Sequence, residues 1–157
     1  MGSPLKLKFD YSFKKLADAT DKQAAKMLNK IAAAAREDIK QGTRAGLDVR
    51  NQPFEPLADS TKKSKRRRGK RIRPLFDENV MVRGTKVTQR AKKADLTAIV
   101  EPGRNIRKRG VVIPALHDFG DGRLPQRAWF GLSKRVGKKI SEILSKGGQE
   151  WLKSGKR

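Results

Sequence analysis

The sequence predicts an α+β fold in which a small antiparallel sheet packs against a long N-terminal helix and a C-terminal helix. Two stretches have helical periodicity, at about 18–42 and 133–151, and two alternating segments between them, at 86–90 and 94–101, have the pattern of a hairpin. A long basic loop, at about 62–74, separates the first helix from the hairpin. Helices on either side of a small meander are typical of one sheet covered by one helical layer.

The first elements are a short strand and the long helix. Apolar and polar residues alternate over 5–13, which is the period of a strand with one apolar face. From Asp18 to Gly42 apolar residues recur at three- and four-residue steps, and the middle of this stretch is rich in alanine. Asp18 or Thr20 can cap the start of the helix, and Gly42 and Gly46 favour its end.

A proline-containing loop follows the helix. Pro53 and Pro56 exclude a central strand or a helix interior, so an extended loop is expected, with Phe54 and Leu57 inserted into the core. The basic loop comes next and closes at Pro74; we expect it to be mobile in the free protein.

The hairpin and the last helix form the second half of the chain. Residues 75–82 are apolar but too few to assign, and the two predicted strands meet in a turn at 92–93. A second basic loop covers 104–109, and residues 111–113 form either a strand or the lead-in to a short helix at 115–119. Ser133 is a suitable cap for the last helix, which Gly147 and Gly148 should end or kink. Its apolar stripe consists of Val136, Ile140, Ile143 and Leu144.

Length and composition predict a single domain over residues 1–157 with a modest core and a frayed tail at 153–157. Apolar residues make up 36% of the chain and aromatic residues 6%, so part of the chain is expected to become ordered only beside a partner. No apolar stretch approaches the roughly 20 residues of a membrane-spanning helix. The first residues also lack the apolar region of a signal peptide.

Charge is the strongest functional signal in the sequence. The chain has 39 Lys and Arg against 16 Asp and Glu, a net charge of +23. Nine of these cations lie within residues 62–73, and the chain would still carry +14 without them. Like charges this dense repel one another until a polyanion neutralises them, which predicts a partner made of phosphates, with nucleic acid foremost. The contact residues expected are Lys62, Lys63, Lys65, Arg66, Arg67, Arg68, Lys70, Arg71 and Arg73, with Arg104, Arg107, Lys108 and Arg109 as a second basic element.

The expected mode of contact is sequence-independent. Arginines on a loop without a recognition helix contact phosphates rather than base edges, and the basic run holds no aromatic side chain on which a base could stack. An acidic neighbouring protein would satisfy the same charges. The plain alternative is a solvated loop with no dedicated partner.

Catalytic and metal-binding patterns are weak. With no cysteine, the chain can form neither disulfides nor thiolate metal sites. His117 beside Asp118 could act as a base with its orienting carboxylate, but no nucleophile accompanies the pair, and a packed helix-end histidine explains it as well. Asp118 and Asp121 match only half of a calcium loop, and no phosphate-loop motif is present. We therefore expect no cofactor, no metal and no enzymatic activity.

Two segments resemble a known family. The segment PFEPLADSTKKSK at 53–65 is similar to an "aromatic-x-Pro-Leu, then Ser/Thr and Lys" motif, and ALHDFGDGRLPQRAWFGLS at 115–133 is similar to an "Ala-x-His-x-x-Gly, then Pro-x-Arg-x-Phe-x-Gly" motif. With the order of the two helices, they resemble the phage virion morphogenesis family over about 18–152. The chain departs from the family at 75–81, where LFDENVM lacks a usual Thr-Gly. The matching positions are Phe54, Pro56, Leu57, Thr61, Lys65, Ala115, His117, Phe119, Gly120, Pro125, Arg127, Phe130, Gly131, Leu132 and Ser133.

The resemblance implies a structural virion protein of the neck or the head-proximal end of the tail, such as a tail completion or tail terminator protein that joins head to tail. It would be assembled in the host cytoplasm, form a homo-oligomeric ring, often hexameric, around the DNA path, and contact neighbouring neck, connector and tail-tube proteins. The alternatives are a cellular nucleic-acid-binding protein, associated with ribosomes or the nucleoid, and a nuclease.

Residues 125–132 also have a physical interpretation of their own. Trp129 and Phe130 are adjacent, so in an extended segment they point to opposite faces, one into the core and one towards a neighbouring subunit. If Trp129 is the outward ring, Trp129→Ala should weaken ring formation more than folding. Arg127 can anchor the turn by pairing with a carboxylate or a helix end. The alternative places all of these side chains within one subunit. The expected interface set is Phe54, Pro56, Leu57, Thr61, His117, Gly120, Pro125, Arg127, Trp129, Phe130 and Gly131.

Overall fold

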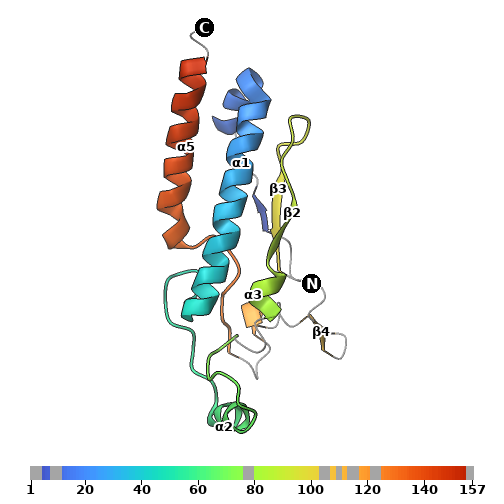
Figure 1. Cartoon of the computed structure of the whole chain (residues 1–157), viewed down its shortest axis with the longest axis vertical. Helices are drawn as coiled ribbons and strands as arrows, with labels where there is room; N and C mark the ends of the chain where they lie inside the picture. The colour runs from blue at the N-terminus through green and yellow to red at the C-terminus, as the bar shows by residue number, and fades with distance from the viewer. Residues whose placement is uncertain are drawn as a thin grey trace.

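The computed structural model of the protein describes residues 5–7, 12–75, 80–102, 107–108, 111–112, 117–120 and 125–154. Two long helices lie side by side, and a small sheet covers the other side of the first helix (Figure 1). The elements are β1 (Leu5–Leu7), α1 (Ser12–Ala45), α2 (Asp59–Arg67), α3 (Val80–Gly84), β2 (Lys86–Gln89), β3 (Ala98–Glu101), β4 (Arg107–Lys108), β5 (Val111–Val112) and α5 (Lys134–Ser154). The predicted α+β class is confirmed.

The main sheet has three antiparallel strands in the order β1-β3-β2. Val100 of β3 pairs with Leu5 of β1 on one side and with Val87 of β2 on the other. Ala98 and Val100 are fully buried while Ile99 is half-buried, so the predicted alternation of faces is confirmed. The predicted turn is also present, because Lys92 forms an isolated bridge with Asp95. A separate two-residue pair joins β4 to β5.

Helix α1 is the central element of the fold. It is longer than the sequence predicted, because it starts at Ser12 and ends at Ala45, where Gly46 takes the positive φ of 77° that ends many helices. The predicted strand over 5–13 is therefore only β1, followed by the helix from Ser12; residues 8–11 lie outside the described part. Asp18, Thr20 and Gly42 lie within the helix rather than at its ends. Its buried face consists of Ala24, Ala25, Met27, Leu28, Ile31, Ala32, Ala35 and Ile39.

Gly42 has a packing role that accounts for its position inside α1. A Cβ at this residue would overlap the guanidinium of Arg135 from α5. Arg135 passes close over the helix and donates from Nε to Asp38 Oδ1 (3.1 Å) and from Nη1 to the Asp48 carbonyl (3.0 Å). The glycine thus lets one arginine join α1, α5 and the loop that follows α1.

Helix α5 begins where the sequence predicted. The Ser133 hydroxyl accepts hydrogen bonds from the amides of Arg135 (3.1 Å) and Val136 (3.4 Å), which is the geometry of an N-cap. The predicted end or kink at 147–148 is wrong, because the helix continues to Ser154. Lys153 and Ser154 of the predicted frayed tail are likewise helical, while residues 155–157 lie outside the described part.

The loop after α1 is fixed by one buried side chain. Phe54 is buried in the main core cluster, as predicted, and its amide donates to the Gly46 carbonyl (2.8 Å). Leu57 is half-buried and Pro56 is exposed. The remainder of the core joins Leu75 and Met81 to the sheet, and Trp129 reaches it from the segment before α5.

Gly147 allows close contact between the two long helices. A Cβ there would overlap Sδ and Cγ of Met27, which is buried in α1, whereas a Cβ at the next residue, Gly148, meets nothing within 4 Å. Neither glycine is required by its backbone conformation inside a helix. The sequence indicated a helix end at Gly147, whereas the structure gives this glycine a packing role inside the helix.

We expect Gly147→Ala to lower the free energy of unfolding by up to about 2 kcal/mol. The destabilisation from the steric clash with Met27 should exceed the stabilisation that alanine gives through its higher helix propensity. Gly148→Ala is the matched control and should stabilise the protein by up to about 1 kcal/mol. Urea unfolding followed by circular dichroism measures both. Equal stabilisation by the two alanines would contradict the packing role of Gly147.

Candidate surfaces for an anionic partner

Much of the predicted basic loop is a helix. Residues 62–67 belong to α2, so the expectation of a mobile loop over 62–74 is wrong for this part. Lys and Arg have high intrinsic helix propensity. The first turn contains Asp59, which pairs with Lys62 at 2.9 Å, and the last turn is basic, an arrangement that suits the helix dipole.

Lys65 folds the rest of the basic run back onto α2. Its side chain is buried, and its Nζ donates to the carbonyls of Arg73 (3.1 Å) and Arg71 (3.4 Å). Gly69, at a φ of 63°, reverses the chain between donor and acceptors. Lys65 was predicted to contact a partner, but its position makes it a structural residue.

Arg73 also has an internal role. Its Nη1 donates to the Arg44 carbonyl at 3.0 Å, which places a cation at the C-terminal end of α1, where the helix dipole favours positive charge. This bond ties the end of the basic run to the central helix. Of the other predicted contact residues, Arg68 donates from Nε to the Ser64 carbonyl (3.3 Å), Lys70 is half-buried and Arg71 is exposed.

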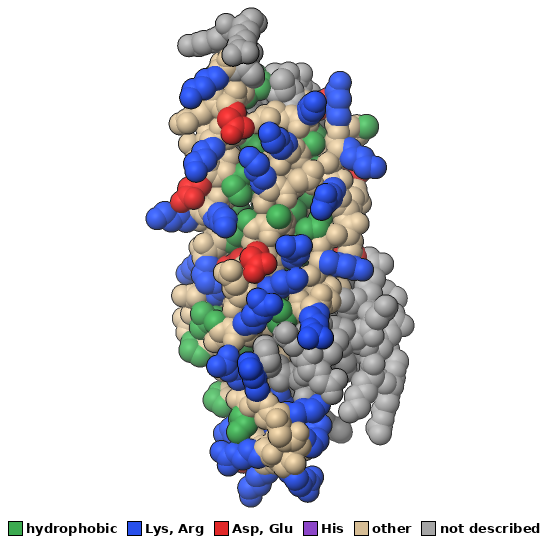
Figure 2. All heavy atoms as spheres, in the orientation of Figure 1, with side chains coloured by type: hydrophobic (Ala, Val, Ile, Leu, Met, Phe, Trp, Pro, Cys, Tyr) green, Lys and Arg blue, Asp and Glu red, His purple; other side chains and the backbone are tan. Residues whose placement is uncertain are grey.

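Three cations of α2 remain directed at solvent. Lys63, Arg66 and Arg67 are exposed, and within the described part of the chain none of them forms an ion pair. We call these three residues the α2 patch. Figure 2 shows basic side chains gathered over α2 at the lower end of the molecule, with basic side chains also spread over the face formed by α5, α1 and the hairpin.

Only part of the second predicted basic element, Arg107 and Lys108, belongs to the described residues. Arg107 and Lys108 form strand β4 rather than a loop, paired with Val112 and Val111 of β5. Of the two alternatives for residues 111–113, the strand is present over the first two residues, and residues 117–119 are helical. Arg104 and Arg109 lie outside the described residues.

Arg127 joins the two segments that carry the family resemblance. The side chain is buried; Nε and Nη2 donate to the Glu55 carbonyl at 3.2 and 3.1 Å, and Nη2 also reaches the Pro56 carbonyl at 3.4 Å. Its amide donates to the His117 carbonyl at 2.7 Å. Burial lowers the pKa of the Arg127 guanidinium from its ordinary value, and the nearby Glu55 charge opposes that shift. The predicted anchoring role is correct, but the acceptors are backbone carbonyls.

Asp118 holds the segment that leads into α5. Its Oδ1 accepts hydrogen bonds from the amides of Trp129 (3.2 Å) and Phe130 (3.3 Å). Burial raises the pKa of the Asp118 carboxyl, and the two amide bonds only partly offset this. The sequence suggested Asp118 only as a partner of His117 or as half of a calcium loop, so this structural role was missed. Among the described residues no group of three or more acidic, His or Cys side chains could hold a metal ion.

Trp129 is a core residue rather than an interface residue. It is 2% exposed, and its ring meets that of Phe130 edge-to-face at a centroid distance of 5.5 Å. Trp129 is therefore the inward ring, and the condition under which Trp129→Ala would weaken assembly more than folding is not met; truncating a buried tryptophan costs folding free energy directly. Phe130 is half-buried. The exposed apolar side chains of this region are Phe119 (65%) and Leu132 (42%).

The remaining residues of the expected interface set have mixed environments. Thr61 lies exposed on α2, while His117, Gly120, Pro125 and Gly131 are half-buried. None of these positions by itself identifies a partner surface.

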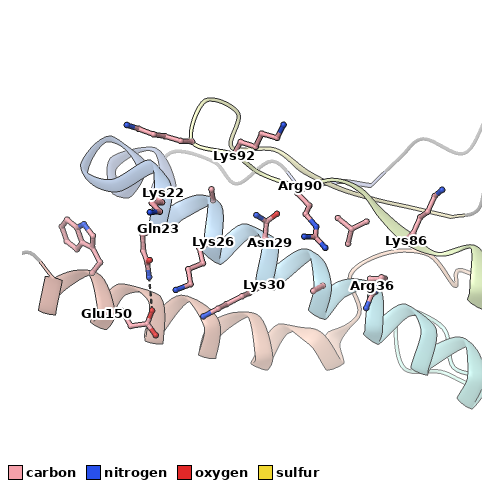
Figure 3. A pocket seen from close by; sticks show the side chains of 15 residues that line it. Lys22, Gln23, Lys26, Asn29, Lys30, Arg36, Lys86, Arg90, Lys92 and Glu150 are labelled. Atoms are coloured by element: carbon pink, nitrogen blue, oxygen red, sulfur yellow. Dashed lines mark hydrogen bonds between the residues drawn. The ribbon is translucent and has the colours of Figure 1, made fainter.

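A second group of cations was missed by sequence reasoning. It lies along α1 and the β2–β3 hairpin, where the two elements border a groove (Figure 3). The four-residue spacing of Lys22, Lys26 and Lys30 was the available signal, since it places three cations on one helix face. The hairpin residues are some 60 positions away, and no local pattern indicates that they lie opposite.

No helix in the described part of the chain is long and apolar enough to cross a membrane.

The raised pKa of Asp118 gives a pH-dependent prediction. The folded protein keeps this proton to a higher pH than the unfolded chain, so the wild-type protein loses stability as the pH rises through the window that starts at about 4. Asp118→Asn retains the Oδ1 acceptor without the titration, so its stability relative to wild type should rise across the same window. Urea unfolding between pH 3 and pH 7 measures the difference.

Asp59→Asn is the control with the opposite sign. The hydrogen bond and charge of Lys62 lower the pKa of the Asp59 carboxyl, so its contribution is present at neutral pH and lost on acidification. Relative to wild type, Asp59→Asn should lose stability as the pH rises. A flat difference for Asp118→Asn across the range would contradict the assignment of Asp118 as a buried acceptor.

The comparisons with known proteins agree with the motif segments. The model of the phage virion morphogenesis family matches residues 7–147, which includes both segments joined by Arg127, all of α1 and the larger part of α5. Neither the search of curated proteins nor that of solved structures gave a match. The match extends over most of the chain, and the protein therefore belongs to the phage virion morphogenesis family.

Proposed function

We propose that this member of the phage virion morphogenesis family is a structural, non-enzymatic protein of the neck or the head-proximal end of the tail. It acts in tail completion or termination, where it joins head to tail as a ring around the DNA path. Family membership carries the virion assembly role. The proposal of a position beside DNA rests on the α2 patch, whose three cations are unpaired within the described structure.

The α2 patch suits a sequence-independent contact with duplex DNA. Lys63, Arg66 and Arg67 project from a short helix at one end of the molecule, opposite the end that holds the hairpin turn (Figure 1). A protruding cationic helix meets the convex phosphate surface of a duplex without reading base edges. Such a contact tolerates any sequence that passes through a ring.

The apolar side chains near the anchored segment suit a contact between subunits. Phe119 is 65% exposed and Leu132 is 42% exposed, and both belong to the segment that Arg127 and Asp118 hold in place. Single exposed apolar residues are normal on any protein. Phe119 and Leu132 lie close in sequence to the residues that Arg127 and Asp118 hold, which makes them our candidates for the apolar centre of an interface. Neighbouring neck, connector and tail-tube proteins would then dock on the faces of the ring.

The experiment is sedimentation velocity with negative-stain imaging of the purified chain, alone and with a short duplex. We expect rings for the wild-type protein, and we expect Phe119→Asp to raise the subunit concentration needed for assembly at least about tenfold, a cost of about 1.4 kcal/mol. Leu152→Asp is the matched control, because Leu152 is 60% exposed but lies on α5, outside the motif segments.

Two outcomes would contradict the proposal. A wild-type chain that stays monomeric at every concentration while it binds duplex would favour the alternative of a cellular nucleic-acid-binding protein. Equal effects of Phe119→Asp and Leu152→Asp would show that the interface lies elsewhere.

A further inference from the structure

A groove of about 970 Å³ runs between α1 and the β2–β3 hairpin, and the end of α5 borders it on the third side (Figure 3). None of its lining residues belongs to α2, which lies at the opposite end of the molecule from the hairpin turn (Figure 1). It is therefore a surface separate from the α2 patch.

Both walls of the groove are cationic. Helix α1 contributes Lys22, Lys26, Lys30 and Arg36, and the hairpin contributes Lys86, Arg90, Lys92 and Lys93. Glu150 of α5 is the one acidic residue of the lining, and its Oε2 accepts a hydrogen bond from Gln23 Nε2 at 3.1 Å. The described lining thus carries eight cations and one carboxylate, and the side chains of Lys86 and Lys92 extend away from α1 (Figure 3).

Within the described part of the chain, these cations have no ion-pair partners. None of the eight forms an ion pair with a described residue, whereas Lys62 and Arg135 elsewhere in the chain each contact an aspartate. Seven of them are exposed, and the eighth, Arg36, has a buried Nε that meets no hydrogen-bond acceptor among the described residues.

The groove is fixed before any partner arrives. Asn29 of α1 donates from Nδ2 to the Ala91 carbonyl and accepts the Ala91 amide on Oδ1, both at 2.9 Å. This double hydrogen bond holds the end of β2 against the helix, and the Gln23–Glu150 bond holds α5. A preformed site loses little conformational entropy on binding.

The shape and lining of the groove favour a peptide over nucleic acid. A duplex presents its phosphates on a convex surface and contacts the rim of a groove better than its floor. Single strands are bound by rows of aromatic side chains, but Trp151 is the one aromatic residue in the described lining. The lining does include the apolar Ala25, Ala33 and Val87.

We propose that this groove binds an acidic segment of a partner protein, with carboxylates against both cationic walls and small apolar side chains over Ala33 and Val87. A second copy of this chain is disfavoured as the occupant of the groove, because its 16 Asp and Glu are scattered among 39 Lys and Arg and form no acidic segment. The inference goes beyond the proposed function and does not depend on it, since the groove would bind the same chemistry outside a ring.

The test uses the full chain and a fluorescein-labelled synthetic peptide of Glu with interspersed Leu, followed by fluorescence anisotropy. The triple variant Lys26→Glu, Lys30→Glu, Arg90→Glu should weaken peptide binding at least about tenfold. The variant Lys63→Glu, Arg66→Glu, Arg67→Glu changes the net charge equally and should weaken it less than about threefold. All six side chains are exposed, and thermal unfolding by circular dichroism checks that both variants stay folded.

A second readout locates the peptide directly. In NMR spectra of the wild-type chain the peptide should shift the amide signals of Ala33 and Val87 and the indole signal of Trp151, with little change on α2. Equal weakening by both triple variants would overturn the proposal in favour of diffuse charge attraction. Loss of duplex binding, but not of peptide binding, in the groove variant would assign the groove to nucleic acid. Loss of self-association alone would assign it to a second copy, and the absence of rings would leave the peptide result unaffected.

Discussion

The structure depends on the apolar face of α1, which must hold the chain together against its own positive charge. This face packs on the sheet on one side and on α5 on the other. Ile31 and Ala32 are fully buried, and so are Ala98 and Val100 of β3. The small alanine side chains of α1 allow the sheet and α5 to pack close to this helix. Gly147 of α5 allows the same close contact from the side of α5. A modest core of this kind leaves little free energy to offset the repulsion of +23 charges.

The chain compensates for its shortage of carboxylates with backbone carbonyls. Lys65 donates to two carbonyls of the segment it folds back, and Arg73 donates to the last turn of α1. Arg127 joins the two motif segments through the carbonyls of Glu55 and Pro56. Arg135 donates to the Asp48 carbonyl in addition to its ion pair with Asp38. Carbonyls can accept these bonds wherever the chain passes. Cations used in this way fix the fold, whereas those of the α2 patch and the groove form no ion pair with a described residue.

Regular periodicity made much of the fold predictable. The apolar spacing along α1, the alternation in β3, the cap at Ser133 and the insertion of Phe54 each follow from local pattern, and each is confirmed. Arg127 was correctly identified as an anchor, although its acceptors could not be known, because carbonyls leave no trace in a sequence. The virion role was accessible through the two motif segments.

The misses involve residues that are distant in sequence. Self-repulsion should keep the basic run extended, but part of it forms helix α2. The chain reverses at Gly69, and this reversal brings the carbonyls of Arg71 and Arg73 to the Lys65 ammonium. Gly147 is in close contact with Met27 of α1, and the groove joins helix and hairpin cations that no local pattern relates. The choice between Trp129 and Phe130 for the core depends on how Asp118 orients the segment.

The central claim is that the unpaired cations of this protein are stabilised by an anionic surface. The most direct measurement is the thermal unfolding midpoint of the wild-type chain with polyglutamate or a short duplex, compared with NaCl at equal ionic strength and with polylysine. At about 100 times the dissociation constant a bound polyanion contributes about 2.7 kcal/mol. The account therefore predicts a midpoint raised by at least about 5 °C beyond the effect of NaCl, and no rise with polylysine. A midpoint that responds to polyanions no more than to NaCl would contradict it.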